Sequence, residues 1–239
     1  MRMKGTHPFI FARGRAEKTS TTEYEGVRPL HSMFDAGFYQ RYYRNPRTRV
    51  ASRADAMRLG RFVCAYTDYL GFTVRRVLDA GCGLGHLRAA VDERFPRARY
   101  TGLETSAYLC RRHGWLQESI ADYAPKQPFD LVFCHDVLQY LDDGTAARAL
   151  GNLGRLSRGA LYFSVLTAGD WRRNADRART DSGVHLRPAS WYRARLLKHF
   201  RHLGGGLLVR RGYDPLLWEL ERPWPAPRRG RSPSAGRQR

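Results

Sequence analysis

The sequence predicts an α/β fold: a doubly wound, mostly parallel seven-stranded sheet with helices on both faces and an antiparallel C-terminal hairpin strand. Three observations support this prediction. Short apolar segments alternate five times with helix-like segments, which is typical of repeated β-α units. One of them, Phe129-Asp-Leu-Val-Phe-Cys134, is apolar almost throughout, as a central strand covered on both faces should be. Two late apolar runs are separated only by glycines, so they can pair as a hairpin at one edge of the sheet.

The individual elements follow from hydrophobic spacing and from capping residues. Apolar side chains recur at helical spacing between Arg53 and Leu70, and Gly71 stops this helix. The polar segment 170–183 is predicted to be a loop. Short apolar runs predict strands at 74–80, 98–104, 115–120, 129–134, 160–166, 200–203 and 206–210. Further helices are predicted at 85–95, after the N-cap Ser106, at 143–156 and at 188–199, with a last helical turn at 214–220.

The chain of 239 residues is long enough for one large domain with appended segments. We divide it into a flexible basic N-terminal segment (1–30), an N-terminal helical lid (31–72), the main α/β domain (73–220) and a tail (221–239). The tail combines proline, glycine and serine with six arginines and has almost nothing to bury, so it is predicted to be disordered. Met33 is a second candidate for the start of the chain.

The chain is strongly basic, with 42 Lys and Arg against 22 Asp and Glu and a formal net charge of +20. Such a charge favours anionic partners such as nucleic acid. However, 38 of the 42 basic residues are arginines, which GC-rich codon usage also produces, and the excess is spread along the chain. Diffuse charge therefore leaves a nucleic-acid partner open without locating a surface for it. The oligomeric state is left open as well.

Several classes of protein are excluded by what the sequence lacks. There is no run of about 18 apolar residues, so no membrane span is predicted. The apolar patch at residues 8–12 is too short for a signal peptide, which favours a cytoplasmic protein. The four cysteines include no C-x-x-C pair, and Cys110-x-x-His113 offers only two ligands on one helical turn. We therefore predict neither a disulfide scaffold nor a metal site.

The clearest functional signal is a glycine loop between a strand and a helix, Asp79-Ala-Gly81-Cys-Gly83-Leu-Gly85-His86. A strand that ends in glycines and opens a helix presents unhindered backbone N–H groups to a ligand. The spacing is G-x-G-x-G, and His86 stands where a dinucleotide-binding loop has its third glycine. The carboxylate of Asp79 would repel a pyrophosphate and attract a cation. The loop therefore predicts a mononucleotide-type pocket for a positively charged ligand.

These residues resemble the first motif of the class I S-adenosylmethionine-dependent methyltransferases, and the resemblance covers about residues 72–212. It implies a Rossmann-like fold and S-adenosyl-L-methionine as the cofactor. In that family the glycine loop wraps the amino-acid part of the cofactor, which corresponds to Asp79, Gly81, Cys82, Gly83 and Gly85 here. An acidic residue that ends the second strand holds both ribose hydroxyls. Glu104 stands in that place with Thr105 beside it, 23 residues after Gly81, close to the length of one β-α-β unit.

The resemblance extends to the third and fourth strands. Asp122-Tyr123 is similar to the family's adenine contact, with Asp122 accepting from the exocyclic amine and Tyr123 or Ile120 forming an apolar wall. Cys134-His135, at the end of the fourth strand, looks like the motif that borders the transferring methyl group. The residues implied to bind the cofactor are therefore Asp79, Gly81, Cys82, Gly83, Gly85, Glu104, Thr105, Asp122, Tyr123, Cys134 and His135.

The chemistry needs an in-line arrangement of nucleophile, methyl group and sulfur, and a base only for a poor nucleophile. His135 and His185 are the candidate catalytic residues, with Asp136 and Gln139 as further candidates, because strand ends and late loops are where open α/β sheets bind ligands. His135 could instead only pack against the cofactor. Candidate substrate contacts are Tyr39, Tyr43, Gln139, Arg187 and Trp191.

The acceptor class is narrowed by missing motifs. Enzymes that methylate exocyclic base amines generally carry Asn/Asp-Pro-Pro-aromatic after the fourth strand, where this chain has Cys134-His-Asp-Val137. Cys134 lacks the neighbouring proline of the enzymes that methylate cytosine C5, and it ends a buried strand, so we interpret it as a packing residue. A small-molecule acceptor is therefore favoured. RNA or a protein is the second choice, and a noncatalytic nucleotide- or RNA-binding scaffold or a nicotinamide-dependent oxidoreductase are the alternatives from other classes.

Overall fold

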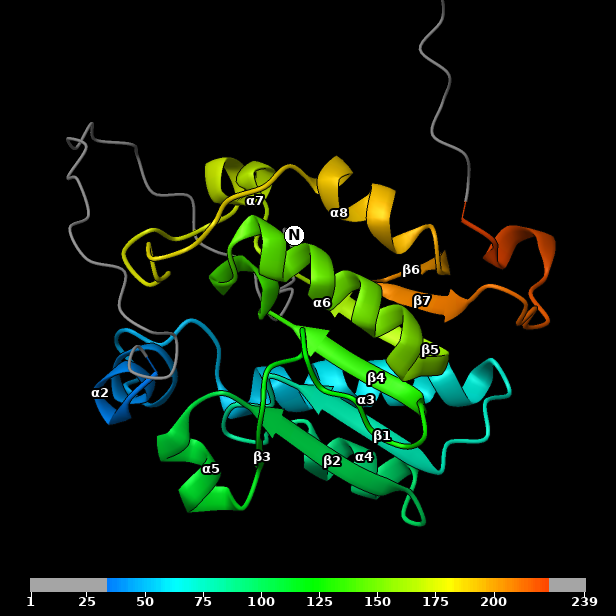
Figure 1. Cartoon of the computed structure of the whole chain (residues 1–239), viewed down its shortest axis with the longest axis horizontal. Helices are drawn as coiled ribbons and strands as arrows, with labels where there is room; N and C mark the ends of the chain where they lie inside the picture. The colour runs from blue at the N-terminus through cyan, green and yellow to red at the C-terminus, as the bar shows by residue number, and fades with distance from the viewer. Residues whose placement is uncertain (1–33, 224–239) are drawn as a thin grey trace, which may run out of the picture.

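A computed structural model of the chain describes residues 34–223, so the expected segment 1–30, the alternative start at Met33 and nearly all of the tail lie outside the described residues. Its centre is a single sheet with strand order β3-β2-β1-β4-β5-β7-β6 (Figure 1). Strands β1 to β5 pair in parallel, whereas β7 is antiparallel to both β5 and β6. The predicted fold class is confirmed. The strands are β1 Arg76–Ala80, β2 Arg99–Glu104, β3 Leu116–Gln117, β4 Phe129–His135, β5 Ser157–Ser164, β6 Phe200–Gly204 and β7 Leu207–Arg210.

Helices cover both faces of this sheet. Figure 1 shows α6 in front of the strands and α3 behind them. No helix within residues 34–223 is both long and apolar enough to cross a membrane. The helical elements are α2 Ala36–Tyr39, η1 Gln40–Arg44, α3 Arg53–Tyr69, α4 Arg88–Arg94, α5 Ala107–His113, η2 Leu138–Tyr140, α6 Asp143–Leu156, α7 Ala168–Arg173, α8 Ala189–Leu196 and η3 Glu219–Glu221.

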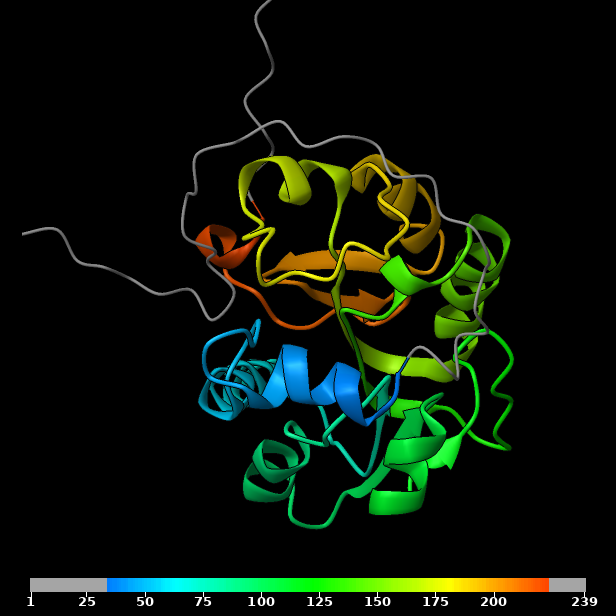
Figure 2. The same ribbon diagram turned by 90° about the vertical axis from the view of Figure 1, so that its left-hand side faces the viewer.

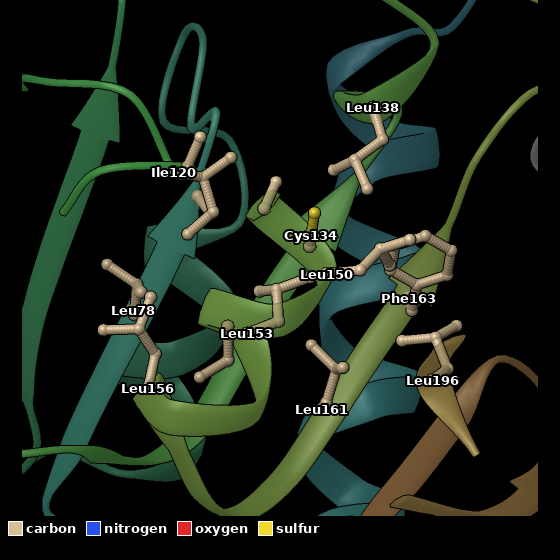
Figure 3. Close-up of a cluster of buried hydrophobic side chains, with 14 of the residues drawn as sticks. Leu78, Ile120, Cys134, Leu138, Leu150, Leu153, Leu156, Leu161, Phe163 and Leu196 are labelled. Atoms are coloured by element: carbon tan, nitrogen blue, oxygen red, sulfur yellow. The ribbon is translucent and has the colours of Figure 1, made fainter. Parts of the chain in front are cut away.

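The core lies in two layers, one on each face of the sheet. On one face, Leu150 and Leu153 of α6 pack with Leu78 of β1 and Leu161 of β5, and all four are buried (Figure 3). On the other face, α3 and α4 pack on β1 and β4 through a second buried cluster that includes Val63. Each such buried aliphatic side chain stabilises the fold by about 1.5 to 3 kcal/mol. These two layers hold the central strands rigidly, so the strand ends are fixed in position.

Several elements differ from the sequence prediction. Helix α7 overlaps the start of the predicted loop 170–183, because Thr167 caps it: its Oγ1 accepts from Asp170 N at 3.1 Å. Strand β3 is only two residues long, since Trp115 before it packs under the glycine loop and the chain turns after it at Ser119, whose carbonyl accepts from Asp122 N at 3.0 Å. Strand β5 begins at Ser157 rather than at Ala160. Helix α4 begins at Arg88, after a longer glycine loop than predicted. The predicted turn 214–220 is reduced to η3.

The carboxyl ends of the parallel strands face one side of the molecule. Figure 2 looks onto this side and shows the blue segment with α2 and η1 lying across it, with the yellow-green segment of α7 above. These two segments are separated by more than 100 residues in the chain. Residues from both of them, and from the strand ends, line the cavity described next.

Candidate functional site

A cavity of about 830 Å³ lies at the carboxyl ends of β1, β4 and β5. A smaller cavity of about 70 Å³ lies beside it, under α2 and against the end of β2. The larger volume lies within the range of roughly 300 to 1,000 Å³ that is typical of small-molecule sites. The two cavities have shared walls, formed by Tyr43, Gly81, Gly83, Asp136 and Tyr140.

The glycine loop between β1 and α4 forms the floor shared by both cavities. Gly81, Gly83 and Gly85 all have positive φ angles, of 73°, 51° and 70°, which side chains rarely tolerate. A Cβ on Gly81 would collide with Val137, and one on Gly85 would collide with Trp115. A Cβ on Gly83 would meet no described atom within 4 Å. Gly83 therefore presents bare backbone to the cavities, where a ligand can approach closely.

Trp115 holds the glycine loop from beneath. Its indole Nε1 donates to the carbonyl of Gly83 at 3.0 Å, and its ring lies against both Gly85 and Gly102. Sequence analysis missed this role. The only available signal was a glycine in the middle of β2, at Gly102, which indicates that a bulky group approaches the strand.

Asp79 is a buried carboxylate in the wall of the larger cavity, with 3% of its surface exposed. It accepts a hydrogen bond from the Tyr100 hydroxyl at 2.6 Å. Burial raises the pKa of Asp79 from 3.8 to about 7; the Tyr100 hydrogen bond lowers this pKa, and the negative charge of Glu104 raises it. A cation bound beside Asp79 would lower this pKa again, so the position favours positively charged ligands.

Glu104 joins the end of β2 to the glycine loop. Its Oε1 accepts from the backbone N–H groups of Thr105 and Ser106, at 2.8 and 3.0 Å, and its Oε2 accepts from Gly83 N at 2.9 Å. The carboxylate is buried, and both Glu104 and Thr105 line the smaller cavity. Ser106 is the N-cap of α5, as predicted, with its Oγ accepting from Leu109 N. This network holds the carboxylate at the boundary between the two cavities.

The end of β4 supplies a second group of polar side chains. His135, Asp136 and Gln139 line the larger cavity, and the His135 Nε2 lies 3.4 Å from the Asp136 Oδ2. Asp136 has a φ angle of 53°, the one positive φ of a non-glycine residue between residues 34 and 223, and its N–H donates to the Ser164 carbonyl at 3.0 Å. Such backbone conformations are costly and concentrate at functional sites.

A family model described as a methyltransferase domain matches residues 48–204, about two thirds of the chain. The chain belongs to this methyltransferase-domain family. A segment of 74 residues is 38% identical to trans-aconitate 2-methyltransferase of Azoarcus sp. (strain BH72), and one of 77 residues is 32% identical to that of Escherichia coli. These segments cover 28% and 29% of this chain, and only 29% and 31% of the length of the curated relatives.

A solved structure has the same fold as this methyltransferase domain. The sugar N-methyltransferase KedS8 from Streptoalloteichus sp. superposes with a TM-score of 0.51 at 19% identity, over 82% of this chain and 98% of that chain. Together with the family model, this confirms the resemblance drawn from the glycine loop and the strand ends. Family membership supports two expectations attached to it: an enzyme that transfers methyl groups, and S-adenosyl-L-methionine as its methyl donor.

Many of the residues expected from the sequence line the cavities of the methyltransferase domain, and others do not. Tyr39 lines the smaller cavity, and Tyr43 lines both. Cys82 lines the larger cavity, and burial raises the pKa of its thiol. Cys134 lines neither; it is fully buried in the core cluster against α6. Gly85 lines neither because Trp115 covers it.

Of the expected adenine contacts, Ile120 lines the smaller cavity, whereas Asp122 and Tyr123 line neither cavity. The Asp122 side chain is exposed, and its Oδ1 lies 3.9 Å from Arg148 Nη2. Because β3 ends at Gln117, Glu118 and Ser119 reach the smaller cavity beside Ile120. Asn152 of α6 holds this turn, donating to the carbonyls of Ile120 and Tyr123 at 2.7 and 2.9 Å.

Three expected catalytic or substrate residues also lie outside the cavities. The side chain of His185 is exposed, and only its backbone N–H reaches the site region, donating to the Gln139 carbonyl at 2.7 Å. Arg187 is buried, and its guanidinium is bonded to Asp143, to Tyr192 and to the carbonyls of η2 and Leu141. Trp191 packs against Arg187 and Arg195. We correct our expectation accordingly: Arg187 and Trp191 hold α8 against η2.

Sequence analysis missed the polar residues that α7 and the turns after it contribute to the wall of the larger cavity. Helix α7 and the turns after it bring Asp170, Arg173, Thr180 and Asp181 to this wall. A polar segment without hydrophobic spacing gives no sign that it folds back over strand ends. Within residues 34–223 there is no group of three or more His, Cys, Asp or Glu side chains that could hold a metal ion.

Proposed function

We propose that this chain transfers a methyl group from S-adenosyl-L-methionine to a small-molecule acceptor. The observation that carries the proposal is Gly83, which presents bare backbone between the buried carboxylates of Asp79 and Glu104 and opens onto both cavities. A nucleoside with a cationic side chain fits this arrangement, because its charge can lie near the carboxylates and its body can lie against the glycine.

The smaller cavity, at about 70 Å³, is too small for a whole nucleoside, so we assign to it only the part of the adenosine that contacts the end of β2, with the rest extending across the shared wall into the larger cavity. Glu104 offers carboxylate oxygens to ribose hydroxyls, and Ile120 offers an apolar surface, with Glu118 beside it as an acceptor for an amine. Phe34, Phe38 and Tyr39 cover this cavity from the N-terminal side. We propose that this aromatic cover is the lid expected from residues 31–72 and that it excludes water from the bound nucleoside.

The larger cavity fits the methionine part together with an acceptor. When bound, the cofactor supplies a methyl group already activated on a sulfonium, so the chain needs mainly to align the acceptor and exclude water. Asp79 and the glycine loop hold the charged end on one side. His135, at the end of β4, is placed to orient the acceptor or to take a proton from it.

A small acceptor is favoured over RNA or protein because the larger cavity is closed on one side by α7 and on the other by η1. The curated relatives are named for trans-aconitate, which is itself a small molecule. The acceptors of those proteins are not carried over here, because the matched segments cover less than a third of their length.

The proposal is tested by calorimetric titration of the full chain with S-adenosyl-L-methionine, S-adenosyl-L-homocysteine, NAD and a short RNA. We expect saturable binding of the first two and none of NAD. Binding of RNA without binding of either sulfur nucleoside would reject the enzyme and favour a scaffold. Binding of NAD alone would favour an oxidoreductase.

Gly83→Val is expected to weaken binding of S-adenosyl-L-homocysteine at least 100-fold, or about 2.7 kcal/mol, because the side chain fills the space that the ligand needs. Gly71→Val is the matched control. Gly71 has a φ angle of 79° and no described atom within 4 Å of an added Cβ, but it ends α3 away from the cavities. Both variants carry the same backbone strain. If both bind normally, or if both lose binding equally, the ligand does not lie on Gly83.

A further inference from the structure

The larger cavity is lined by more carboxylates than basic side chains, although the chain as a whole is basic. Asp136, Asp170 and Asp181 line it, and Arg173 is the single Lys or Arg among the described lining residues. Asp79 is set apart, because it lies at the glycine loop. In a chain of formal net charge +20, this concentration of carboxylates is not explained by composition.

Gln139 adds an independent sign of a ligand in this cavity. Its side chain is 4% exposed and lines the cavity, and its Oε1 is buried without a hydrogen bond to any residue in the part of the chain that the structure describes. Leaving a buried acceptor unpaired costs about 1 to 3 kcal/mol. An incoming N–H or O–H group would recover this energy, so the position calls for a hydrogen-bond donor.

Two of the carboxylates converge on the same place. The negative charges of Asp136 and Asp181 both act on Tyr43 and on Tyr140, where they add to the effect of burial in raising the pKa of each phenol. Both phenols therefore keep their protons at neutral pH. Asp136 of the β4 end and Asp181 of the loop after α7 line the same cavity as Tyr43 and Tyr140, so both carboxylates and both phenols surround one space.

Asp170 and Arg173 contribute less to this acidic region. The Asp170 carboxylate already accepts from Thr167 Oγ1 at 2.6 Å and from Asn174 Nδ2 at 2.8 Å, which stabilises the first turn of α7. Arg173 is largely exposed and folds back against Gly169 of its own helix. Asp136, Asp181 and the Gln139 Oε1 therefore provide acceptors to a ligand in this cavity.

We propose that this acceptor region, formed by Asp136, Asp181 and Gln139, binds a methyl acceptor through a primary or secondary amino group, and that the chain is an N-methyltransferase. The inference rests on the proposed function. An ammonium group matches two carboxylates and an amide oxygen in charge and in donors. A carboxylate acceptor would meet the like charge of both aspartates.

The reaction balances with an amine and needs no further reagent. The ammonium form first loses one proton to water. The nitrogen then gives its lone pair to the new N–C bond, the pair of the broken C–S bond stays on sulfur, and the product leaves as an ammonium that carries the former sulfonium charge.

The test measures binding rather than turnover. The full chain, saturated with S-adenosyl-L-homocysteine, is titrated with two series of compounds that differ mainly in charge: tyramine, tyrosol and 4-hydroxyphenylacetate, and glucosamine, glucose and glucuronate. We expect the amine of at least one series to bind about tenfold or more tightly than its acidic analogue, with the neutral compound between them. If neither amine binds more tightly than its neutral and acidic analogues, the proposal is overturned.

Variants of Asp181 test whether this carboxylate produces the preference for an amine. The Asp181 Oδ1 accepts from Gly183 N at 3.0 Å, which an asparagine preserves. Asp181→Asn should reduce the preference for the amine about tenfold, and Asp181→Lys should reverse it towards the carboxylate. Asp176→Asn, in the same loop but outside the cavity wall, is the control and should leave the preference unchanged.

Binding of S-adenosyl-L-homocysteine distinguishes the two possible failures. If the wild type and all three variants bind it but Asp181→Lys keeps the wild-type preference, the acceptor region is wrong and the proposed function stands. If the wild type does not bind it at all, the proposed function itself fails.

Discussion

Two buried aspartates lie near opposite ends of the central strands, and their surroundings differ completely. Asp130, near the start of β4, accepts from Arg75 N and Arg76 N at 2.8 and 2.9 Å, and its Oδ1 lies 2.6 Å from Arg158 Nε. Asp79, near the end of β1, is paired with the hydroxyl of Tyr100. These partners hold the pKa of Asp130 below its ordinary value, whereas burial raises the pKa of Asp79 to about 7.

This difference between the two aspartates assigns Asp130 to stability and Asp79 to ligand binding. At the amino end of the sheet the charged form of Asp130 is stabilised by its partners, so this carboxylate contributes to folding. At the carboxyl end the charged form of Asp79 is disfavoured until a cation arrives. A buried carboxylate that costs stability in the free protein is what a binding site for a cation requires, and it lies where parallel α/β sheets bind ligands.

The largest effect is expected from Asp79→Asn, which should stabilise the free protein. The folded pKa of about 7 lies above the ordinary 3.8, so the folded state holds this proton more tightly than the unfolded state. The free energy of unfolding therefore falls as the pH rises from about 4 to about 7, and the full cost is present above 7. Asparagine removes a cost of up to about 4 kcal/mol at pH 8 and still accepts from Tyr100. Denaturant unfolding at pH 8 and at pH 4 measures the gain.

The same variant should lose affinity for S-adenosyl-L-methionine, because the attraction for its positive charge is gone. The gain in stability should shrink towards pH 4. A variant that is less stable than the wild type at pH 8, or one that binds the cofactor as before, would contradict our account of Asp79.

Glu104→Ala tests whether Glu104, at the carboxyl end of β2, binds the cofactor or only holds the backbone. Glu104 resembles Asp130 in accepting from backbone N–H groups, but it lines a cavity. We expect its loss to weaken binding of S-adenosyl-L-methionine by about 1 to 3 kcal/mol, measured by calorimetry. Asp122→Ala is the control, because Asp122 is exposed and outside both cavities; it should bind normally. The opposite ranking would restore Asp122 as the adenine contact.

The smallest effect is expected from Asp130→Asn, which should destabilise the protein by about 1 to 2 kcal/mol at pH 7 without changing cofactor affinity. Because the pKa of Asp130 is lowered in the folded state, its contribution is present at neutral pH and lost as the pH falls through that pKa. Denaturant unfolding at pH 7 and pH 3 should show this deficit shrinking in acid, whereas Asp79→Asn should show a gain that shrinks in acid. A change in cofactor affinity would show that Asp130, at the amino end of the sheet, also affects the binding site at the carboxyl end.

Much of the fold could be predicted because its signals are local. The apolar run of β4, the N-cap Ser106 and the glycines between β6 and β7 each act within a few residues, and each predicted its element correctly. Helix α7 was missed because its cap, Thr167, lies in a polar segment without hydrophobic spacing. Strand β3 was predicted too long because Trp115 contacts the glycine loop and the chain turns at Ser119, and no local pattern records either feature.

The candidate site divides in the same way. Asp79 and Glu104 lie near the ends of strands and Gly83 follows one, so the pattern of the glycine loop and the resemblance to the family were enough to single them out. Asp122 was misplaced because the length of β3 decides which residue of the following segment reaches the smaller cavity. Arg187 was expected at a substrate, but its bonds to Asp143 and to the carbonyls of Leu138 and Leu141 join segments distant in sequence.

By itself the sequence determined the alternation of strands and helices and the loop of glycines with its two carboxylates, because those features depend on backbone conformation and on neighbours along the chain. Only the tertiary structure decided what surrounds the larger cavity. That wall is assembled from η1, the end of β4 and the segment after α7. The chemistry of a cavity between such distant segments depends on which side chains meet across it, and neither spacing nor composition contains that information.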